Sequence, residues 1–371
     1  MITPLESTYD WSEKSVLVTG GTGSFGQHFI GTLLRDHRPR RLIVFSRDEL
    51  KQHEMRQLYP DGDGSPMRYF IGDVRDVDRL RRAMGGVDLV IHAAAMKQVP
   101  TCEYNPIEAV LTNVMGAKNV IEAALDTGVQ RVVALSTDKA VNPANLYGAT
   151  KLVAEKLFVQ GNAYAGTGPT RFACVRYGNV VGSRGSVIPL FLKQRSAGRV
   201  TVTDERMTRF WITLDQGVAF VIKCAERMAG GEVFVPKLPS TGMMSVVETA
   251  APGCDVEIIG IRPGEKLHEV LISADEARTT VELDDMYVVC PPQPWYFEQP
   301  WTGRPLSDGF WYGSENNPCS LDAAELRMIV DGCMAGPSAG SAARGGVAAP
   351  AGAPVGAPEL LPPREAMRAA H

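Results

Sequence analysis

The side chains best suited to chemistry are a tyrosine and a lysine four positions apart in the sequence. In Tyr147-x-x-x-Lys151, this spacing places both side chains on one face of a helix. An ammonium group beside a phenol stabilises the phenolate and lowers the pKa of the tyrosine. Such a phenolate can take a proton from a substrate hydroxyl while a hydride leaves for a nicotinamide. The pair therefore predicts the base of an oxidation step, and Lys151 can also hold the nicotinamide ribose.

A second reactive cluster, Ser136-Thr137-Asp138-Lys139, follows a predicted strand and precedes the tyrosine. Thr137 can hydrogen-bond the oxygen that is being oxidised, while Asp138 and Lys139 place an acid and a base candidate side by side. A plain dehydrogenase needs neither of these two groups. A dehydratase needs both, because one group must remove the proton alpha to the new ketone and another must protonate the departing hydroxyl. The alternative is an ion pair in a surface loop.

A glycine-rich turn predicts a dinucleotide site near the N-terminus. It follows an apolar strand at 15–19 and contains both G-x-x-G-x-x-G and G-x-G-x-x-G. Glycines allow the backbone to approach a pyrophosphate, and the N-terminus of the following helix offers free N–H groups to the anion. The predicted cofactor contacts here are Gly20, Thr22, Gly23, Ser24, Phe25 and Gly26.

The end of the second predicted strand favours NADP over NAD. NAD-binding proteins usually carry an acidic residue here to hold the ribose 2′-hydroxyl. This chain has Ser46 and Arg47, followed within one turn by Lys51, and these groups can bind a 2′-phosphate. A solvated basic helix start is the alternative, and Asp48 can still bind the ribose. The predicted contacts in this segment are Ser46, Arg47, Asp48, Glu49, Leu50 and Lys51.

Further cofactor contacts are predicted at the ends of the next two strands and on the helix beyond them. Asp73 and Val74 can reach the adenine edge, and the small residue Ala93 lets the backbone lie against the nicotinamide half. Lys97 can face the nicotinamide, the sugar or both. Asn113 completes the predicted set.

These groups require a sheet of parallel strands covered by helices on both faces. Near-continuous apolar runs at 15–19, 41–45, 67–71, 89–93, 131–136 and 170–175 alternate with helical patterns, for example at 107–127. This alternation predicts an α/β fold, a Rossmann-type doubly wound parallel sheet with a smaller C-terminal substrate-binding lobe. We predict an NADP-binding domain at 12–178, a substrate-binding lobe at 179–334 with some elements packing back on the sheet, and a disordered Ala/Gly/Pro-rich tail at 335–371.

Composition excludes several other classes of protein. The net charge of −4 does not indicate binding to nucleic acid or to an anionic membrane. No apolar run approaches the roughly 18 residues needed to span a bilayer. The polar N-terminus does not resemble a signal peptide. Seven scattered cysteines without a C-x-x-C pair and six scattered histidines predict neither a disulfide framework nor a metal site. We expect a cytoplasmic protein.

The longer motifs resemble one branch of the extended short-chain dehydrogenases. These motifs are VVALSTDKAVNPANLYGATKL, HAAAMKQVPTCEYNP, RYGNVVGSRGSVIPLF, TRFWIT and IGIRPGEKLHE, and the similarity covers about residues 12–290. The branch is the inverting UDP-N-acetylglucosamine 4,6-dehydratases of pseudaminic acid biosynthesis. The resemblance suggests a role in flagellin glycosylation, and the sequence leaves open whether flagellin, capsule or lipopolysaccharide receives the sugar. Beyond residue 290 the chain matches the branch only loosely.

The resemblance implies a three-step reaction on UDP-N-acetylglucosamine with one tightly held NADP. C4 is oxidised with Tyr147 as base, water is lost across C5 and C6, and the hydride returns to C6. C5 is then reprotonated from the opposite face, which gives UDP-2-acetamido-2,6-dideoxy-β-L-arabino-hexos-4-ulose. Lys139 stands where the dehydratases that retain the C5 configuration have Glu. By resemblance it handles the C5 proton, and Asp138 serves the C6 hydroxyl. Lysine acts as a base only with a lowered pKa, which we expect from neighbouring cations such as Lys97.

The resemblance also implies a substrate site in the second half of the chain. Beside Lys97 and Tyr147, the implied substrate contacts are Asn179, Val180, Val187, Ile188, Pro189, Leu190, Phe191, Arg209, Arg262 and Glu265, and a basic stretch runs through Arg184. The arginines suit a diphosphate, although surface ion pairs are the alternative. Trp211 is expected to belong to the core.

Two other functions fit parts of this pattern. A nucleotide-sugar epimerase uses the same tyrosine, lysine and cofactor but does not need Asp138 and Lys139. A non-catalytic NADP-sensing protein on the same fold tends to lose the tyrosine, which is present here. Short-chain dehydrogenases usually self-associate, so we expect a homo-oligomer, a dimer or a hexamer.

Overall fold

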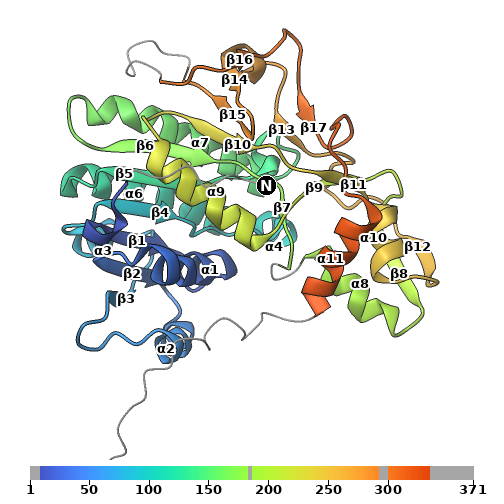
Figure 1. Cartoon of the computed structure of the whole chain (residues 1–371), viewed down its shortest axis with the longest axis horizontal. Coiled ribbons are helices and arrows are strands. Elements are labelled where there is room, and N and C mark those ends of the chain that lie inside the picture. The colour runs from blue at the N-terminus through green and yellow to red at the C-terminus, as the bar shows by residue number, and fades with distance from the viewer. Residues whose placement is uncertain (1–8, 183–185, 292–299, 335–371) are drawn as a thin grey trace, which may run out of the picture. The chain divides into compact units, whose positions relative to one another are not determined.

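A single ten-stranded sheet organises the part of the chain that the computed structural model describes, residues 9–182, 186–291 and 300–334 (Figure 1). Its strand order is β16-β14-β15-β10-β6-β5-β4-β1-β2-β3. Seven neighbouring strands run parallel: β3 (Met67–Ile71), β2 (Arg41–Ser46), β1 (Ser15–Thr19), β4 (Leu89–His92), β5 (Arg131–Leu135), β6 (Arg171–Val175) and β10 (Val233–Pro236). Antiparallel strands β15 (Met286–Val289), β14 (Thr280–Glu282) and β16 (Arg304–Pro305) extend the sheet beyond β10.

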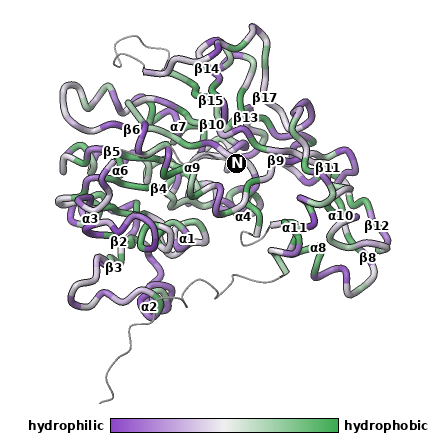
Figure 2. The backbone as a smooth tube through the Cα atoms, viewed as in Figure 1, coloured by the Kyte–Doolittle hydropathy of each residue, from purple (hydrophilic) through white to green (hydrophobic). Residues whose placement is uncertain are grey.

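The central strands form because their apolar, largely β-branched residues are buried by helices on both faces of the sheet. Every residue of β1 is buried, and hydrophobic residues concentrate along the strands in Figure 2. Helices α3 (Val77–Met84), α6 (Gly116–Thr127) and α7 (Leu146–Ala165) pack in one layer. Helices α1 (Ser24–Thr32) and α9 (Leu214–Arg227) pack together in another, and α2 (Glu49–Leu58) contacts β2 and β3. The doubly wound α/β fold is confirmed.

The six predicted strands are found within one residue of their expected ends. The helical pattern at 107–127 is divided into α5 (Pro106–Ala109), a π-helical stretch at Val110–Met115 and α6. A short helix, α4 (Val99–Tyr104), precedes it. The first helix likewise continues into a π-helical stretch at Leu33–His37.

The strand order reverses beside β1, which is where a doubly wound sheet opens a crevice for ligands. Two glycines of the turn after β1 make this crevice possible. Gly20 has φ 66°, and a Cβ atom there would lie 2.9 Å from the backbone of Ala94. A Cβ on Gly26 would lie 2.5 Å from the Cα of Gly21. The glycines therefore permit the tight turn and the close packing of α1 against it.

The smaller lobe has its own hydrophobic core. It contains α8 (Val187–Arg195), α10 (Met243–Ala250), α11 (Ala323–Met334) and the paired strands β8 (Arg199–Val202) and β12 (Asp255–Ile258). Strands β7 (Asn179–Val180), β9 (Thr208–Ile212) and β11 (Ser240–Gly242) form a second sheet, and β13 (Val270–Ile272) pairs with β17 (Tyr312–Gly313). The predicted tail at 335–371 lies outside the described residues.

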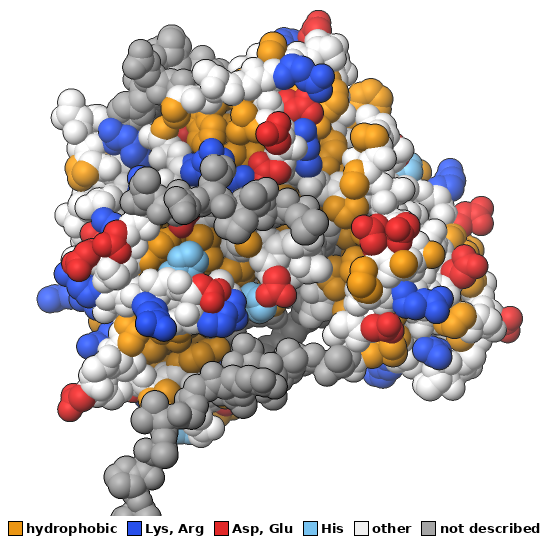
Figure 3. All heavy atoms as spheres, viewed as in Figure 1, with side chains coloured by type: hydrophobic (Ala, Val, Ile, Leu, Met, Phe, Trp, Pro, Cys, Tyr) orange, Lys and Arg blue, Asp and Glu red, His pale blue; other side chains and the backbone are white. Residues whose placement is uncertain are grey.

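The surface fits the modest net charge. Lys and Arg side chains are intermixed with Asp and Glu on the face shown in Figure 3. Across the described residues, no helix combines the length and apolarity that a membrane crossing requires.

A buried ion cluster links α7 to the second half of the chain. The Arg176 guanidinium is fully buried and contacts both Glu155 on α7 and Glu276, and it also donates a 2.8 Å hydrogen bond to the carbonyl of Leu271. Glu155 in turn accepts a 2.6 Å hydrogen bond from Ser136 Oγ at the end of β5. The cluster therefore connects the Ser136–Lys139 segment to the chain that follows β13.

We expect Glu155→Gln to destabilise the protein by about 3–5 kcal/mol, because it leaves the Arg176 charge buried with one partner removed. Chemical unfolding checks this, with Glu122→Gln in an exposed ion pair as the matched control. A change no larger than that of the control would contradict the expectation.

Candidate active site

One large pocket collects most of the predicted functional side chains. Its volume is about 840 Å³, and it lies at the carboxyl ends of β1, β4, β5 and β6, extending to residues of α8, β8 and β9. This is the place where open α/β sheets bind ligands.

Helix α7 places Tyr147 and Lys151 in the pocket wall. Asn145 caps the helix by accepting a hydrogen bond from Gly148 N, which fixes where its first turn begins. Lys151 Nζ donates a 2.7 Å hydrogen bond to the carbonyl of Leu135, and burial lowers the pKa of Lys151. The two side chains thus lie on the same side of the helix, as the spacing predicts.

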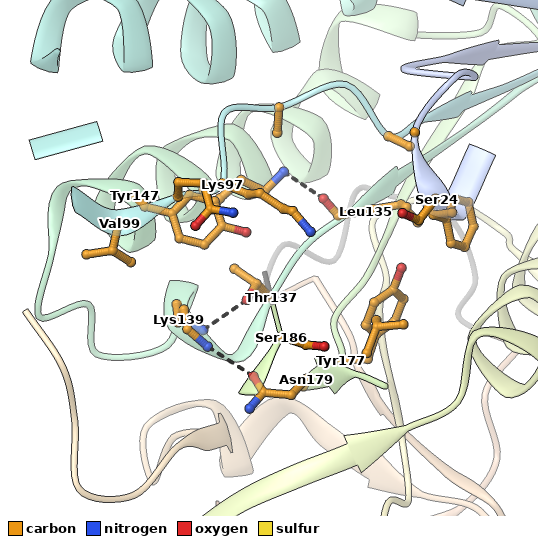
Figure 4. Close-up of a pocket in the computed structure, with 18 of the residues that line it drawn as sticks. Ser24, Lys97, Val99, Leu135, Thr137, Lys139, Tyr147, Tyr177, Asn179 and Ser186 are labelled. Carbon is orange, nitrogen blue, oxygen red and sulfur yellow. Dashed lines mark hydrogen bonds between the residues drawn. The ribbon is translucent and has the colours of Figure 1, made fainter. Parts of the chain in front are cut away.

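The cation that acts most strongly on Tyr147 is Lys139. Burial raises the pKa of Tyr147 to about 12, while the charge of Lys139 and a hydrogen bond with Thr137 act in the opposite direction. We expected Lys151 to have this effect, and for this structure that assignment is wrong. Figure 4 shows the labelled Tyr147, Thr137 and Lys139 side chains in one pocket.

Lys139 carries the contacts of an ammonium group. Its Nζ lies 3.0 Å from Asp138 Oδ1, 3.2 Å from Glu269 Oε1 and 3.4 Å from Asn179 Oδ1. Burial alone would lower the pKa of Lys139, but the charges of Asp138 and Glu269 outweigh it and raise the pKa above its ordinary value. The predicted lowering of the pKa is therefore wrong for this structure, because two carboxylates face the amine.

Asp138 lies behind the pocket wall rather than in it. Its side chain is 1 % exposed, and its Oδ1 accepts hydrogen bonds from Thr137 Oγ1 and Lys139 Nζ. Its Oδ2 is buried and has no hydrogen-bond partner among the described residues. In this arrangement Asp138 does not reach the pocket, so it cannot contact a substrate directly. The carboxylate of Asp138 contacts Thr137 and Lys139 instead.

The glycine-rich turn and its neighbours form the half of the pocket suited to a dinucleotide. All six predicted residues of the turn line it, together with Asp73, Val74, Ala93 and Lys97. Asn113 does not line it. Its side chain accepts a 2.8 Å hydrogen bond from Met96 N and donates a 3.0 Å hydrogen bond to Thr150 Oγ1, so it holds the loop after β4 against α7.

The end of β2 provides cations at the rim of this half. Arg47 is 59 % exposed, with its guanidinium 3.6 Å from Asp73, and Lys51 pairs with Asp48, the N-cap of α2. Ser46 Oγ lies deeper and accepts a 3.0 Å hydrogen bond from Gln52. Glu49 and Leu50 do not line the pocket, because the first turn of α2 directs them to the surface.

The other half of the pocket contains most of the predicted substrate contacts. Lining residues are Asn179, Val180, Val187, Leu190, Phe191, Arg209, Arg262 and Glu265. Ile188 is buried in the core of the smaller lobe and Pro189 is exposed, so neither lines the pocket. Arg209 donates hydrogen bonds to the carbonyls of Thr208, Leu267 and Lys266, which uses part of its guanidinium. Arg184 lies outside the described residues.

The pocket also contains residues that the sequence did not indicate. Glu269 and Lys266 face Lys139 from a segment that follows β12. Trp211 belongs to the smaller core, as expected, but it also lines the pocket, and its Nε1 has no hydrogen-bond partner among the described residues. Glu269 stands in the motif IGIRPGEKLHE, but nothing in its local pattern indicates which lysine it faces.

The described residues contain no group of three or more His, Cys, Asp or Glu side chains that could hold a metal ion. The pocket instead offers hydroxyl, amine and carboxylate groups beside a loop suited to a pyrophosphate. This set of groups can remove and return protons next to a hydride-transfer cofactor.

Comparison with known proteins connects the pocket to nucleotide-sugar enzymes. Residues 16–291 match the family model described as polysaccharide biosynthesis protein. The chain is 50 % identical over 331 residues to the UDP-N-acetylglucosamine 4,6-dehydratase (inverting) of Campylobacter jejuni, covering 86 % of this chain and 98 % of that protein. It is 42 % identical over 287 residues to the UDP-glucose 4-epimerase of Rickettsia conorii, covering 74 % and 82 %.

Solved structures of similar fold include a nucleotide-sugar dehydratase. Pen from Bacillus thuringiensis has a TM-score of 0.80 and 38 % identity, with 88 % of this chain and 99 % of that chain covered. The dTDP-glucose 4,6-dehydratase DesIV from Streptomyces venezuelae, solved with NAD and TYD bound, has a TM-score of 0.59 and 25 % identity, covering 68 % and 86 %.

Proposed function

Because this chain belongs to the polysaccharide biosynthesis protein family, in the branch that contains the inverting UDP-N-acetylglucosamine 4,6-dehydratases, we propose that it dehydrates UDP-N-acetylglucosamine with inversion at C5. The product is UDP-2-acetamido-2,6-dideoxy-β-L-arabino-hexos-4-ulose, the first intermediate towards pseudaminic acid. The observation that carries the proposal is the Asp138–Lys139 ion pair, in which Lys139 lines one pocket with Thr137 and Tyr147 and Asp138 is buried behind its wall. An epimerase has no use for that pair.

In this proposal the chain's own residues move the protons. Tyr147, as phenolate, takes the proton of the C4 hydroxyl, whose oxygen is held by Thr137. Lys139, as the neutral amine, receives the C5 proton, and the Asp138–Lys139 pair then gives one proton to the departing C6 hydroxyl, which leaves as water. C5 receives a proton from solvent on the opposite face, and Tyr147 releases the proton of the C4 hydroxyl to solvent, so that both groups return to their starting states. A nicotinamide with its ribose held by Lys151 would supply the hydride chemistry, taking the hydride from C4 and returning it at C6.

The pocket fits a nicotinamide dinucleotide, and we propose that it is NADP. The close glycine turn before α1 leaves room for a pyrophosphate at the N-terminus of that helix. Arg47 and Lys51 stand at the rim where a 2′-phosphate would lie, and Ser46 lies beside them. Lys151 would hold the nicotinamide ribose.

We expect Arg47→Ala to weaken NADP binding by about tenfold, the effect of losing about 1.4 kcal/mol of a charge-assisted phosphate contact. Affinity for NAD should change little, because NAD lacks the 2′-phosphate. Calorimetric titration with both cofactors checks this, and Arg56→Ala, an exposed arginine on α2, is the control. Equal losses for NADP and NAD would overturn the assignment of Arg47.

The activity is tested by NMR in D₂O with purified protein, NADP and UDP-N-acetylglucosamine. A 4-keto-6-deoxy product with deuterium at C5 and the L-arabino configuration is expected. The same product with C5 retained would leave the dehydratase in place but refute inversion. A product that keeps its 6-hydroxyl would indicate an epimerase, the activity that the Rickettsia conorii relative is named for. If the protein binds the cofactor but does not convert UDP-N-acetylglucosamine, the assignment of this substrate is refuted.

A further inference from the structure

Glu269 presents a second buried carboxylate to Lys139. It precedes β13, its side chain is 4 % exposed, and its Oε1 lies 3.2 Å from Lys139 Nζ. The same Oε1 is 4.0 Å from Arg209 Nε, and Oε2 is 3.8 Å from Lys266 Nζ. Oε2 has no hydrogen-bond partner among the described residues. The Glu269 carboxylate at the pocket wall therefore has three cations around it, Lys139, Arg209 and Lys266.

Two carboxylates face the amine of Lys139. Its Nζ donates hydrogen bonds to Asp138 Oδ1 and Asn179 Oδ1, and it forms an ion pair with Glu269 Oε1 at 3.2 Å. Two buried negative charges this close favour the ammonium over the neutral amine. Asp138 is the neighbour of Lys139 in the chain, so its contact is local, whereas Glu269 approaches from another segment and gives the ammonium its second negative charge.

We propose that Glu269 is a positioning residue that fixes both the location and the positive charge of Lys139. This proposal adds a residue to the proposed function, and its consequences for catalysis rest on that function. With Glu269 in place, the cation stands beside Tyr147 and favours the phenolate that C4 oxidation requires. The same contact opposes loss of a proton from Lys139, and so limits removal of the C5 proton at neutral pH.

The charged and titratable groups that set the protonation of Lys139 come from several elements. They are Asp138 beside it, Tyr147 on α7, Arg209 on β9, and Lys266 and Glu269 on the segment before β13. Asp138 and Glu269 favour the ammonium, and Arg209 and Lys266 oppose it. Removing the charge of Glu269 leaves two opposing cations against one supporting carboxylate.

The test that does not depend on turnover is chemical modification of Lys139. The full-length protein is treated with acetic anhydride across a pH series, and acetylation of each lysine is followed by peptide mass spectrometry. Only the neutral amine reacts, so the midpoint of the pH curve reports the pKa. In the wild type the midpoint for Lys139 should lie above that of the exposed Lys118. A midpoint at or below that of Lys118 would overturn the proposal without any variant.

The variants then assign the effect to Glu269. In Glu269→Gln the Lys139 midpoint should move to lower pH by at least about one unit, a tenfold rise in labelling at a fixed pH. Glu269→Asp keeps the charge and should stay closer to the wild type, and Glu257→Gln on the exposed strand β12 is the matched control. An unchanged midpoint in folded Glu269→Gln would overturn the proposal.

Turnover separates this proposal from the proposed function. In Glu269→Gln, the pH midpoint of C5 deuterium exchange should shift downward while C4 oxidation slows, because the cation beside Tyr147 is weakened. A residue with only a structural role would lower both rates without moving the midpoint, and that result would also overturn the proposal. If the wild type does not convert UDP-N-acetylglucosamine, the proposed function fails, and the labelling midpoints still decide the role of Glu269.

Discussion

Replacing Tyr147 with phenylalanine should slow turnover of UDP-N-acetylglucosamine by about 10²–10⁴-fold, the usual contribution of a positioned general base. The ring remains, so the pocket keeps its shape, but the C4 hydroxyl loses the group that takes its proton. Because burial raises the pKa of Tyr147 to about 12, the phenolate is a minor form at neutral pH. The rate of C4 oxidation in the wild type should therefore increase with pH through the neutral range.

Stopped-flow measurement of reduced nicotinamide over a pH series checks this expectation. In Tyr147→Phe the pH-dependent increase should disappear, while cofactor affinity stays within a few fold of the wild type. Tyr164→Phe, an exposed tyrosine near the end of the same helix, is the matched control. Turnover of Tyr147→Phe within tenfold of the wild type would show that another group removes the C4 proton.

Replacing Lys139 with arginine should separate the two chemical steps. Arginine keeps a positive charge between Asp138 and Glu269, so the buried carboxylates remain paired and the phenolate of Tyr147 is still favoured. A guanidinium stays protonated and cannot accept the C5 proton. We expect C4 oxidation to persist, and C5 exchange and water loss to fall by about 10²–10⁴-fold.

The readout combines NMR of C5 deuteration with the absorbance of the reduced cofactor, which should accumulate in this variant. Lys139→Met is compared with Lys139→Arg because it removes the cation paired with the buried Asp138, and breaking a buried ion pair costs about 3–5 kcal/mol of stability. Lys118→Arg in an exposed ion pair is the control. If Lys139→Arg exchanges C5 at the wild-type rate, Lys139 is not the base at C5.

Several local features of this protein were readable from the sequence, although the π-helical stretches at Leu33–His37 and Val110–Met115 were not. The apolar strands, the glycine turn and the Tyr147–Lys151 spacing depend on residues within a few positions of one another. Steric rules and hydrophobic periodicity act over that range. The doubly wound sheet follows from the alternation of such segments, and the predicted strands were confirmed within one residue. Most of the predicted pocket residues also line one cavity, since the ends of parallel strands meet at one edge of the sheet.

What the sequence did not determine is the charge state of the site. Lys139 was expected to have a lowered pKa because cations were its evident neighbours, but folding brings Glu269 from a distant segment to within 3.2 Å of it. Asp138 was expected to meet substrate, yet the turn after β5 buries it behind Thr137. Electrostatic interactions depend on the distances between side chains and on their burial, and neither quantity is encoded by local spacing. Only the tertiary structure decided that Lys139 is held as a cation between two carboxylates.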